Sequence, residues 1–371
     1  MNGHAHMGFP IDEVWIDEDA RDEPLTGEIL RRLPSCRVRT GQDAIDAYER
    51  LILESDPFRH GKRILRLIRH RGAFVKPCPG TKEHVCCGLQ ILHIGQGCPM
   101  DCRYCALQAY FNRPALEVFV NVDEMLDGLR QRLTTDPNRL HRICTGEFTD
   151  SLALDPITDL ASKLVHFFCQ QQNASLEIKT KTDFVEPLLD LDPRGRVVLS
   201  FSMNAAEIAS NEERGAASLK RRLQAAAQAQ KKGYLLGFHF DPIIPFPGWE
   251  QGYGRTIDRI FRAVDPQGIS WISLGILRFV PELKEIARAR FGPLPYFHDG
   301  FVRGLDGKQR LPAQRRIEIY QKLGDRIRTH APETRIYLCM ESPYVWKRAL
   351  DMKIGKDQDL IEYLDQAMRD G

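Results

Sequence analysis

The sequence predicts an α/β protein built on a partial (β/α)6 TIM-type barrel with parallel strands, plus a helical N-terminal segment and a C-terminal α/β extension. From residue 89 onward, short apolar or β-branched segments alternate with stretches of helical periodicity, a pattern typical of βα units in a parallel sheet. Six units in roughly 190 residues are fewer than the eight of a full barrel, which typically takes about 250 residues. A six-unit partial barrel fits this number.

The elements follow one another in a regular order. The expected strands are 89–95, 142–147, 176–182, 196–202, 234–241 and 270–277. The expected helices between them include 123–133, 159–172, 218–233 and 256–265. A late strand candidate follows at 335–341, and a helix-like segment at 359–370.

Three regions result from this pattern. Residues 1–75 form a mainly helical segment with one short strand candidate at 14–16, residues 76–280 form the barrel, and residues 281–371 form an extension that we consider a substrate-binding region. The first region ends in basic residues at roughly helical spacing, for which a solvated helix face is the commoner explanation and a phosphate-binding patch the alternative. These residues are Lys62, Arg63, Arg66, Arg69 and Arg71.

Composition excludes few classes of function. Of the 371 residues, 43% are hydrophobic and 27% are charged, as in ordinary globular proteins, and the net charge of +2 does not by itself indicate nucleic acid. No apolar run approaches the roughly 18 to 20 residues of a membrane span, and the polar, acidic start is unlike a signal peptide. We therefore expect a cytoplasmic protein without membrane contact.

Three of the ten cysteines, Cys98, Cys102 and Cys105, are closely spaced after the first expected strand. In a reducing compartment such a group indicates metal binding or catalysis rather than disulfides. Three thiolates can hold three irons of a cubane cluster and leave the fourth iron open to a chelating ligand. A structural zinc site needs a fourth ligand, for which His93 or Cys87 is available. A closed ferredoxin-type cluster would need Cys144.

The cysteine spacing C-x3-C-x2-C, with Tyr104 directly before Cys105, resembles the signature of radical S-adenosylmethionine enzymes. A wider set of segments is similar, in order and spacing, to the spore photoproduct lyase family over roughly residues 75 to 280. These segments are "GCPMDCRYCALQ", "CTGEFTDSLALD", "TKTDFVEPLL", "FSMN" and "GYLLGFHFDPIIPFPGWEQGY".

The resemblance implies a 4Fe-4S cluster on Cys98, Cys102 and Cys105 whose open iron is chelated by S-adenosyl-L-methionine. Reductive cleavage of that cofactor to a 5'-deoxyadenosyl radical would start hydrogen abstraction from a thymine photolesion in DNA and its reversal. The implied partners are DNA as substrate and an electron donor such as a flavodoxin or ferredoxin. The implied enzyme is a radical SAM lyase of DNA repair.

The resemblance also implies individual roles. Tyr104 would act against the cofactor, with a packing aromatic ring as the alternative. Lys181 would reach the cofactor carboxylate, although Lys179 points the same way in a regular strand. The other implied cofactor-binding residues are Thr145, Gly146 and Glu147 near the cofactor ammonium, and Ser202 and Asn204, although Ser202 alternatively caps the next helix.

Cys144 matches the cysteine that returns a hydrogen atom to the product radical in the family, and a buried small hydrophobe is the alternative. The family has a tyrosine directly after the last cluster cysteine, whereas this chain has Ala106. Tyr104 or Tyr110 would then substitute, or the chemistry differs. Asp241 replaces a small residue of the family pattern.

Two other functions stay open. The first is a radical enzyme that uses the same scaffold on a different substrate, which Ala106 favours. The second is a zinc-stabilised nucleic-acid-binding protein without catalysis. For DNA, the C-terminal region adds Arg310, Arg315 and Arg316 to the basic candidates. Cys78, Cys86 and Cys87 lie outside the family pattern, and we interpret them as thiols packed beside the barrel rather than as a second metal site.

Overall fold

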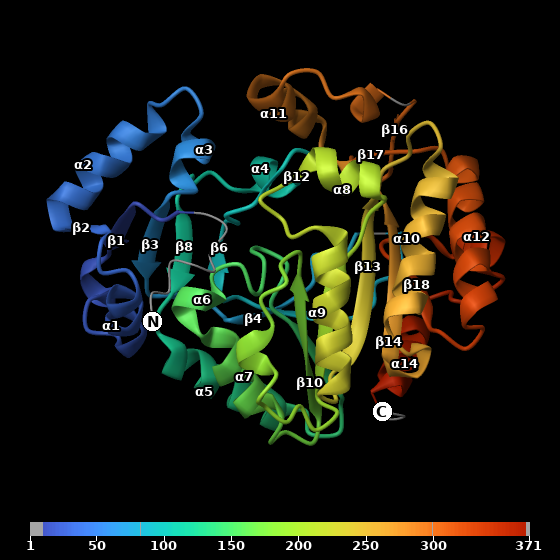
Figure 1. Ribbon diagram of the computed structural model, residues 1–371, viewed down its shortest axis with the longest axis horizontal. Coiled ribbons are helices and arrows are strands. Elements are labelled where there is room, and N and C mark those ends of the chain that lie inside the picture. Colours follow the sequence, from blue (N-terminus) through green and yellow to red (C-terminus); the bar gives the residue numbers. More distant parts are fainter. Residues whose placement is uncertain (1–9, 82, 299, 369–371) are drawn as a thin grey trace.

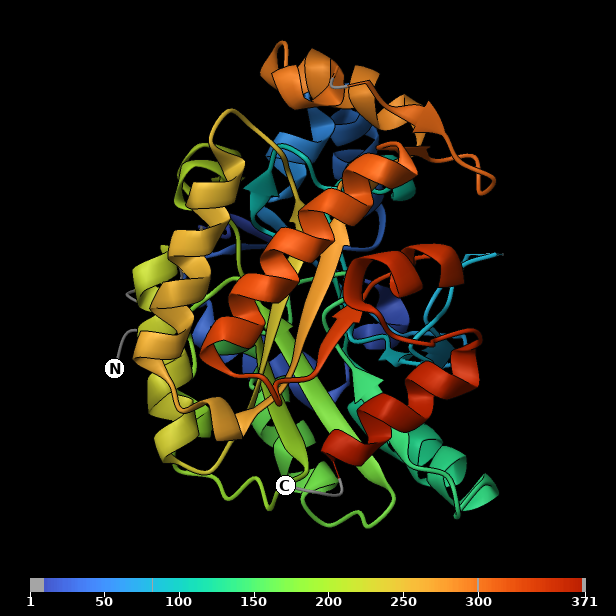
Figure 2. The ribbon, with the colours of Figure 1, turned by 90° about the vertical axis from the view of Figure 1, so that its right-hand side faces the viewer.

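The computed structural model describes residues 10–81, 83–298 and 300–368, and its centre is one curled sheet of eight strands (Figures 1 and 2). The strand order is β18-β14-β13-β11-β10-β9-β5-β4. The bounds are β4 Val75–Pro77, β5 Gln90–Leu92, β9 His141–Cys144, β10 Ala174–Thr180, β11 Val197–Ser202, β13 Leu235–Ile243, β14 Ile269–Ile276 and β18 Ile336–Leu338. Neighbours from β5 to β18 are parallel, and β4 is antiparallel to β5.

All six expected barrel strands are confirmed, and the late strand candidate adds β18 as a seventh parallel strand. The expectations for residues 1–9 and 369–370 lie outside the described residues.

Helices connect the strands and cover the outer face of the sheet (Figure 2). Their bounds are α5 Val122–Thr135, α6 Asp155–Thr158, α7 Leu160–Phe168, α8 Ala206–Glu212, α9 Leu219–Lys231 and α10 Trp249–Ala263. Helix α7 packs on β10, and α9 packs on β11 and β13. In α10, the fully buried side chains of Tyr253, Ile257 and Ile260 recur at three- and four-residue spacing, which gives the helix one apolar face.

The chain between β4 and β5 spans the gap between the two edges of the sheet. Val85 forms an antiparallel bridge with Glu341, just after β18, and its backbone N donates to the Glu341 carbonyl at 2.9 Å. Residues 78–81 and 83–89, which include Cys78, Cys86 and Cys87, therefore lie across the seam of the partial barrel.

A second sheet lies beside the barrel, in the order β2-β1-β3-β8-β6. Its strands and helices are β1 Glu13–Ile16, α1 Pro24–Arg32, β2 Arg37–Thr40, α2 Gly41–Ile52, α3 Pro57–Gly61, β3 Ile64–Ile68, β6 Gly95–Gln96 and β8 Leu116–Phe119. The helices of the N-terminal segment and the strand candidate at 14–16 are present. The helical spacing expected for the arginine-rich stretch is wrong, because Leu65 and Leu67 are fully buried on either side of Arg66 in strand β3.

The first part of the C-terminal extension, up to residue 310, lies over the carboxyl ends of the barrel strands, whereas the helices at 313–330 and 357–367 lie beside the sheet (Figures 1 and 2). Its elements are β15 Arg278–Phe279, α11 Pro281–Phe291, β16 Val302–Arg303, β17 Gln309–Arg310, α12 Ala313–His330, α13 Pro343–Leu350 and α14 Asp357–Ala367. Strand β15 follows directly on β14 and pairs with β17, which places this small antiparallel sheet at the barrel rim. Within the described ranges, every helix is too short or too polar to cross a membrane.

Candidate active site

The three predicted cluster cysteines lie in one loop between β6 and α4 (Leu107–Tyr110). In this loop, the short strand β7 (Asp101–Cys102) pairs with β12 (Glu213–Arg214), which follows β11 and α8 along the chain. Cys102 is buried, whereas Cys98 and Cys105 are half-buried, and all three line one small pocket.

Two side chains hold the carbonyl groups of this loop. The ammonium of Lys62 donates to the carbonyl oxygens of Cys98 at 2.7 Å and Met100 at 2.5 Å. The amide of Gln108 donates to the carbonyl oxygens of Cys102 and Cys105, each at 3.3 Å. The backbone around the thiols is thus held by polar contacts from two sides.

Arg290 of α11 reaches the same loop from the C-terminal extension. Its guanidinium donates to the side-chain oxygen of Gln108 at 2.5 Å and to Asp101 at 3.1 Å. It also binds Asp56 of the N-terminal segment at 3.0 Å. Sequence reasoning missed Arg290 and assigned Lys62 only to the basic group of the N-terminal segment, because each lies far along the chain from the cysteines it positions.

Burial raises the pKa of the Cys98 thiol to about 12 and raises the pKa of Cys102 well above its ordinary value. Ligand binding by these thiols must therefore displace protons, as metal or cluster assembly does. In the described part of the chain, no three His, Cys, Asp or Glu side chains are grouped closely enough to hold a single metal ion. A cubane cluster binds its cysteines through different irons, so this spaced set of soft thiols fits a 4Fe-4S cluster.

The predicted residues after β9 form a compact turn. Cys144 is fully buried, and its sulfur accepts the backbone N–H of Gly146 at 3.4 Å. The Thr145 hydroxyl donates to the Ser151 hydroxyl at 2.7 Å. A Cβ on Gly146 would lie 2.7 Å from the carbonyl oxygen of Lys179, so the turn requires glycine.

Lys179 and Lys181 differ in their surroundings. Lys179 binds Glu147 at 3.3 Å across the strand ends, whereas the ammonium of Lys181 has no ion pair within the described ranges. The backbone N of Lys181 donates to Asp150 at 2.7 Å, and the same carboxylate accepts the Thr180 hydroxyl and the backbone N of Leu152. Asp150, which sequence reasoning missed, therefore ties the turn after β9 to the end of β10.

Tyr104 points into a buried polar network rather than into open space. Its hydroxyl donates to Glu213 at 2.5 Å, and Glu213 forms a fully buried ion pair with Arg222 at 2.5 Å. Asn204 joins this network, since its amide donates to Glu213 at 3.3 Å and its oxygen accepts the Tyr253 hydroxyl at 2.6 Å. Glu213 thus brings Tyr104 and Asn204 together, although no local sequence motif indicated this glutamate.

Ser202 and Asp241 lie at the ends of neighbouring strands. The Ser202 carbonyl oxygen accepts a hydrogen bond from the Arg222 guanidinium at 2.7 Å. Among the described residues, the Ser202 hydroxyl does not cap helix α8. Asp241 binds Arg278 through both carboxylate oxygens at 3.2 Å, and Arg278 also donates to the Cys339 sulfur at 3.3 Å. Asp241 is therefore held by the C-terminal extension.

The cluster loop and the turn after β9 are in direct contact. The backbone N of Gly97, next to Cys98, donates to the Phe148 carbonyl at 3.1 Å. Since β5 and β9 are parallel and Ile91 pairs with Cys144, both loops leave the sheet at the same edge. The structure thus brings the expected strand-end residues to one rim of the barrel.

The alternative of an unpaired basic patch at the end of the N-terminal segment is not seen among the described residues, because acidic side chains neutralise the basic ones. Arg66 binds Asp17 at 2.8 Å and Arg71 binds Asp19 at 2.7 Å. The other basic side chains are paired as well: Arg63 with Asp12, Arg69 with Glu23 and Glu124, and Lys62 with Asp101.

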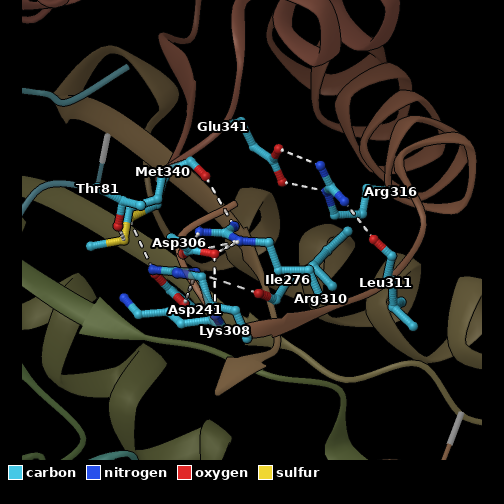
Figure 3. A network of polar contacts seen from close by, with 12 residues as sticks. Thr81, Asp241, Ile276, Asp306, Lys308, Arg310, Leu311, Arg316, Met340 and Glu341 are labelled. Carbon is cyan, nitrogen blue, oxygen red and sulfur yellow. Dashed lines mark hydrogen bonds and ion pairs between the residues drawn. The ribbon is translucent and has the colours of Figure 1, made fainter. Parts of the chain in front are cut away.

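The C-terminal arginines are paired too, as Figure 3 shows for two of them. Arg310 of the hairpin binds Asp306 at 2.6 Å, and Arg316 binds Glu341 at 2.9 Å (Figure 3). Arg315 binds Glu318 on the same helix at 2.6 Å. These three arginines therefore organise the extension, and none of them presents an unpaired charge.

The curled parallel sheet and the three-cysteine loop at its rim define a protein of the radical S-adenosylmethionine superfamily. A sequence model described as "Spore photoproduct lyase" matches residues 88–292, more than half of the chain. The chain belongs to the spore photoproduct lyase family.

Two curated relatives are similar in sequence. The spore photoproduct lyase of Bacillus subtilis (strain 168) is 32% identical over 174 residues, 47% of this chain and 51% of the relative. The spore photoproduct lyase of Geobacillus sp. (strain Y412MC61) is 28% identical over 201 residues, 53% of this chain and 59% of the relative. The chain thus spans only about half to three fifths of the length of these relatives.

Solved structures show the same fold. A spore photoproduct lyase mutant with bound AdoMet and dinucleoside spore photoproduct has a TM-score of 0.78 at 21% identity, over 89% of this chain and 99% of that chain. A spore photoproduct lyase complexed with dinucleoside spore photoproduct has a TM-score of 0.77 at 22% identity, over the same shares. The predicted partial barrel with its two extensions is confirmed.

Proposed function

We propose that this chain is a radical S-adenosylmethionine lyase that reverses a thymine photolesion in DNA. One observation carries the proposal most directly: the hydrogen bond from Gly97 to Phe148 brings the cluster loop against the turn that follows Cys144. Cys98, Cys102 and Cys105 would hold a 4Fe-4S cluster, which together with S-adenosylmethionine supplies a 5'-deoxyadenosyl radical that takes hydrogen from the substrate. Family membership and the bound ligands named for the similar structures support this proposal.

The remaining rim residues would bind the cofactor. Lys181 is the better candidate for the cofactor carboxylate, because Lys179 is already neutralised by Glu147. Glu147, Thr145 and Gly146 would face the cofactor ammonium from the turn after β9. Their packing against β10 supports a common site.

Ser202, Asn204 and Tyr104 would shape the opposite side of the cofactor site. The buried contacts of Asn204 and Tyr104 with Glu213 favour positioning rather than direct chemistry for both side chains. A role for Tyr104 in hydrogen transfer requires that its hydroxyl leaves Glu213.

Cys144 would return a hydrogen atom to the product radical. Its complete burial and the raised pKa of its thiol, about 12 because of burial, keep the S–H bond intact at neutral pH. A thiol rather than a thiolate is the form that donates a hydrogen atom.

DNA is the proposed substrate, and the C-terminal extension (residues 281–371) is the proposed substrate-binding region, because its first part, around α11 and β17, lies at the carboxyl ends of the strands. The similar structures are named with a dinucleoside spore photoproduct, which supports a DNA-derived substrate. A flavodoxin or ferredoxin would supply electrons. The ten free cysteines favour the reducing cytoplasm as the location.

Anaerobic reconstitution with iron and sulfide, followed by incubation with S-adenosylmethionine, reductant and DNA carrying spore photoproduct, tests the proposal. We expect repaired thymine together with 5'-deoxyadenosine. Formation of 5'-deoxyadenosine without repaired thymine would reject the substrate and keep the enzyme class.

Ala106 favours a second candidate, a radical enzyme of the same scaffold with another substrate. The family tyrosine at this position would lie next to Cys105, and alanine has no O–H to take part in hydrogen transfer. An Ala106→Tyr variant discriminates between the two candidates. If the substrate is the thymine lesion, this variant repairs it at least as well as the native chain.

A further inference from the structure

The loop with the cluster cysteines has two faces. One face lies toward the turn after β9, where the backbone N of Gly97 donates to the Phe148 carbonyl at 3.1 Å. The other face lines a hollow between the N-terminal segment and the C-terminal extension, and all three cluster cysteines contribute to it. Among the described residues, its lining includes none from strands β9 to β14, so we call it the outer hollow. Its other walls include Phe58 of α3, Phe111 and Arg113 after α4, and Arg290 of α11.

Three elements around the outer hollow are held against one another, and they lie at the same end of the molecule (Figure 1). Gly61, at the end of α3, packs directly on the chain after α4, because a Cβ on this residue would lie 2.2 Å from the Pro114 carbonyl oxygen. Arg290 of α11 binds Asp56, the N-cap of α3, at 3.0 Å and Gln108 of α4 at 2.5 Å. Close packing and charged contacts therefore hold the rim of this hollow.

The exposed side chains on this rim are basic or aromatic. Arg59 of α3 is exposed, and its guanidinium forms no ion pair among the described residues. Arg113 is 57% exposed, whereas its partner Glu117 is 1% exposed, so the positive member of this pair faces solvent and the negative member is buried. Tyr110 of α4 is 48% exposed and adds a large ring. We call Arg59, Tyr110 and Arg113 the rim group.

Acidic residues do not offset the rim group on its own elements. Neither α3 nor residues 107–114 contain an aspartate or a glutamate. The acids next to these elements, Asp56 and Asp101, are both bound by Arg290, at 3.0 and 3.1 Å. The rim group therefore presents positive charge to solvent.

Helix α11, on the other side of the hollow, carries both signs of charge. Glu285 pairs with Arg288 at 2.9 Å, and both side chains are exposed. Glu282 lies in the first turn of α11, about two helical turns from Arg290. The surplus of positive charge is thus on the side of α3 and α4.

An electron source must reach the cluster loop while the cofactor and the substrate are bound. In the proposed site, these two ligands occupy the face of the loop that lies toward the turn after β9. The outer hollow reaches the same cysteines from elsewhere, and Cys98 and Cys105 are half-buried rather than fully enclosed. A protein that rests on the rim group can therefore approach the cluster loop without displacing either ligand.

We propose that the rim group is the docking surface of an acidic one-electron carrier of the flavodoxin or ferredoxin class, an inference that rests on the proposed function. An acidic partner is complementary in charge to Arg59 and Arg113, and opposite charges steer a partner into one orientation. Tyr110 supplies an aromatic contact of the kind that interfaces favour. In each encounter the reduced carrier loses one electron and the chain gains one. Reductive cleavage of S-adenosylmethionine to methionine and the 5'-deoxyadenosyl radical consumes that electron.

Binding is measured on the reconstituted full chain without S-adenosylmethionine, with oxidised flavodoxin as the probe. We expect the dissociation constant to rise about fivefold in Arg59→Glu, because the reversal changes two charges at the interface. Arg113→Gln, which keeps a polar side chain beside Glu117, should raise it about twofold. Arg259→Glu on α10 is the matched control, since Arg259 is also exposed and without an ion pair among the described residues. The effect of Arg59→Glu should disappear between about 0.05 and 0.5 M salt.

Cofactor cleavage measures the electron transfer itself. 5'-Deoxyadenosine is counted with reduced flavodoxin and, separately, with dithionite, a small reductant that needs no docking surface. Arg59→Glu should lower the rate with flavodoxin about fivefold relative to the rate with dithionite, whereas Arg259→Glu should keep the ratio of the native chain.

The outcomes separate the docking surface from the reaction. Equal losses with both reductants would show that Arg59 acts on the site rather than on the carrier, and would overturn the inference. Native binding by Arg59→Glu would overturn it as well, and so would the failure of both a flavodoxin and a ferredoxin to bind the native chain. A native chain that forms no 5'-deoxyadenosine with dithionite contradicts the proposed function, and the binding comparison still decides the docking surface.

Discussion

The guanidinium of Arg290 lies 2.5 Å from the side-chain oxygen of Gln108, although 182 residues separate them. Gln108 in turn donates to the carbonyl groups of Cys102 and Cys105. Helix α11 of the C-terminal extension thereby positions the loop that carries the cluster cysteines.

Replacing Arg290 by alanine should weaken cluster assembly. The substitution removes contacts to Gln108, Asp101 and Asp56, so we expect about a twofold lower iron content after reconstitution and a free energy of unfolding lower by about 2 kcal/mol. Iron analysis and urea unfolding measure the two effects. Arg288→Ala on the same helix, where Arg288 pairs with an exposed glutamate, is the matched control. Equal effects of both substitutions would contradict the role of Arg290.

Lys181 and Lys179 should differ in cofactor binding. Lys181→Met should weaken S-adenosylmethionine binding about tenfold, because the variant loses a charge-assisted contact to a carboxylate. Lys179→Met should change the dissociation constant less than about threefold, because its charge is already balanced by Glu147. Equilibrium binding to the reconstituted protein measures both constants. A larger loss for Lys179→Met would reverse the two assignments.

The ion pair of Glu213 and Arg222 should dominate the stability of the rim. Both side chains are completely buried, so Arg222→Met leaves an uncompensated carboxylate and should lower the free energy of unfolding by about 3 to 5 kcal/mol. Arg255→Met removes an exposed pair with Glu207 and should cost less than about 1 kcal/mol. Urea unfolding compares the two. A similar decrease in the free energy of unfolding for both variants would show that burial of the Glu213–Arg222 pair is not decisive.

Ionisation of Glu177 in the barrel interior should make the free energy of unfolding depend on pH in the acidic range. Burial by itself raises the pKa of this carboxyl, but His239, Lys179 and Ser200 outweigh burial and lower the pKa to about 2. Since the folded-state pKa lies below the unfolded value of 4.5, the stabilisation is complete above that value and is lost as pH falls toward about 2. We expect roughly 3 kcal/mol across this window.

Urea unfolding at several pH values between these limits measures the effect. Glu177→Gln should lack most of the pH dependence that the native chain shows, whereas Glu282→Gln, at an exposed position of α11, should retain it. An unchanged profile in Glu177→Gln would assign the acid sensitivity to other carboxyls.

The barrel was predictable because its signals are local. Each parallel strand is a short aliphatic run between helical segments, and the strand ends follow from those runs. The arginine-rich stretch at 64–68 was misjudged, because its apolar residues also fit helical spacing over so short a length. Pairing of β3 with β1 and β8 decided in favour of the strand.

The charges were the least predictable part of the site. Positive residues such as Arg66 and Arg316 form a basic surface only if no acid lies nearby, and their acids, Asp17 and Glu341, come from distant parts of the chain. Sequence spacing does not reveal which side chains meet across elements.

The order of the βα units and the three thiols for a cluster could be predicted without the structure, because hydrophobic period and short-range spacing are properties of neighbouring residues. The contacts of Arg290 with the cluster loop and of Tyr104 with Glu213 follow only from the folded structure. These contacts join residues that the packing of whole elements brings together, and no local pattern encodes that packing.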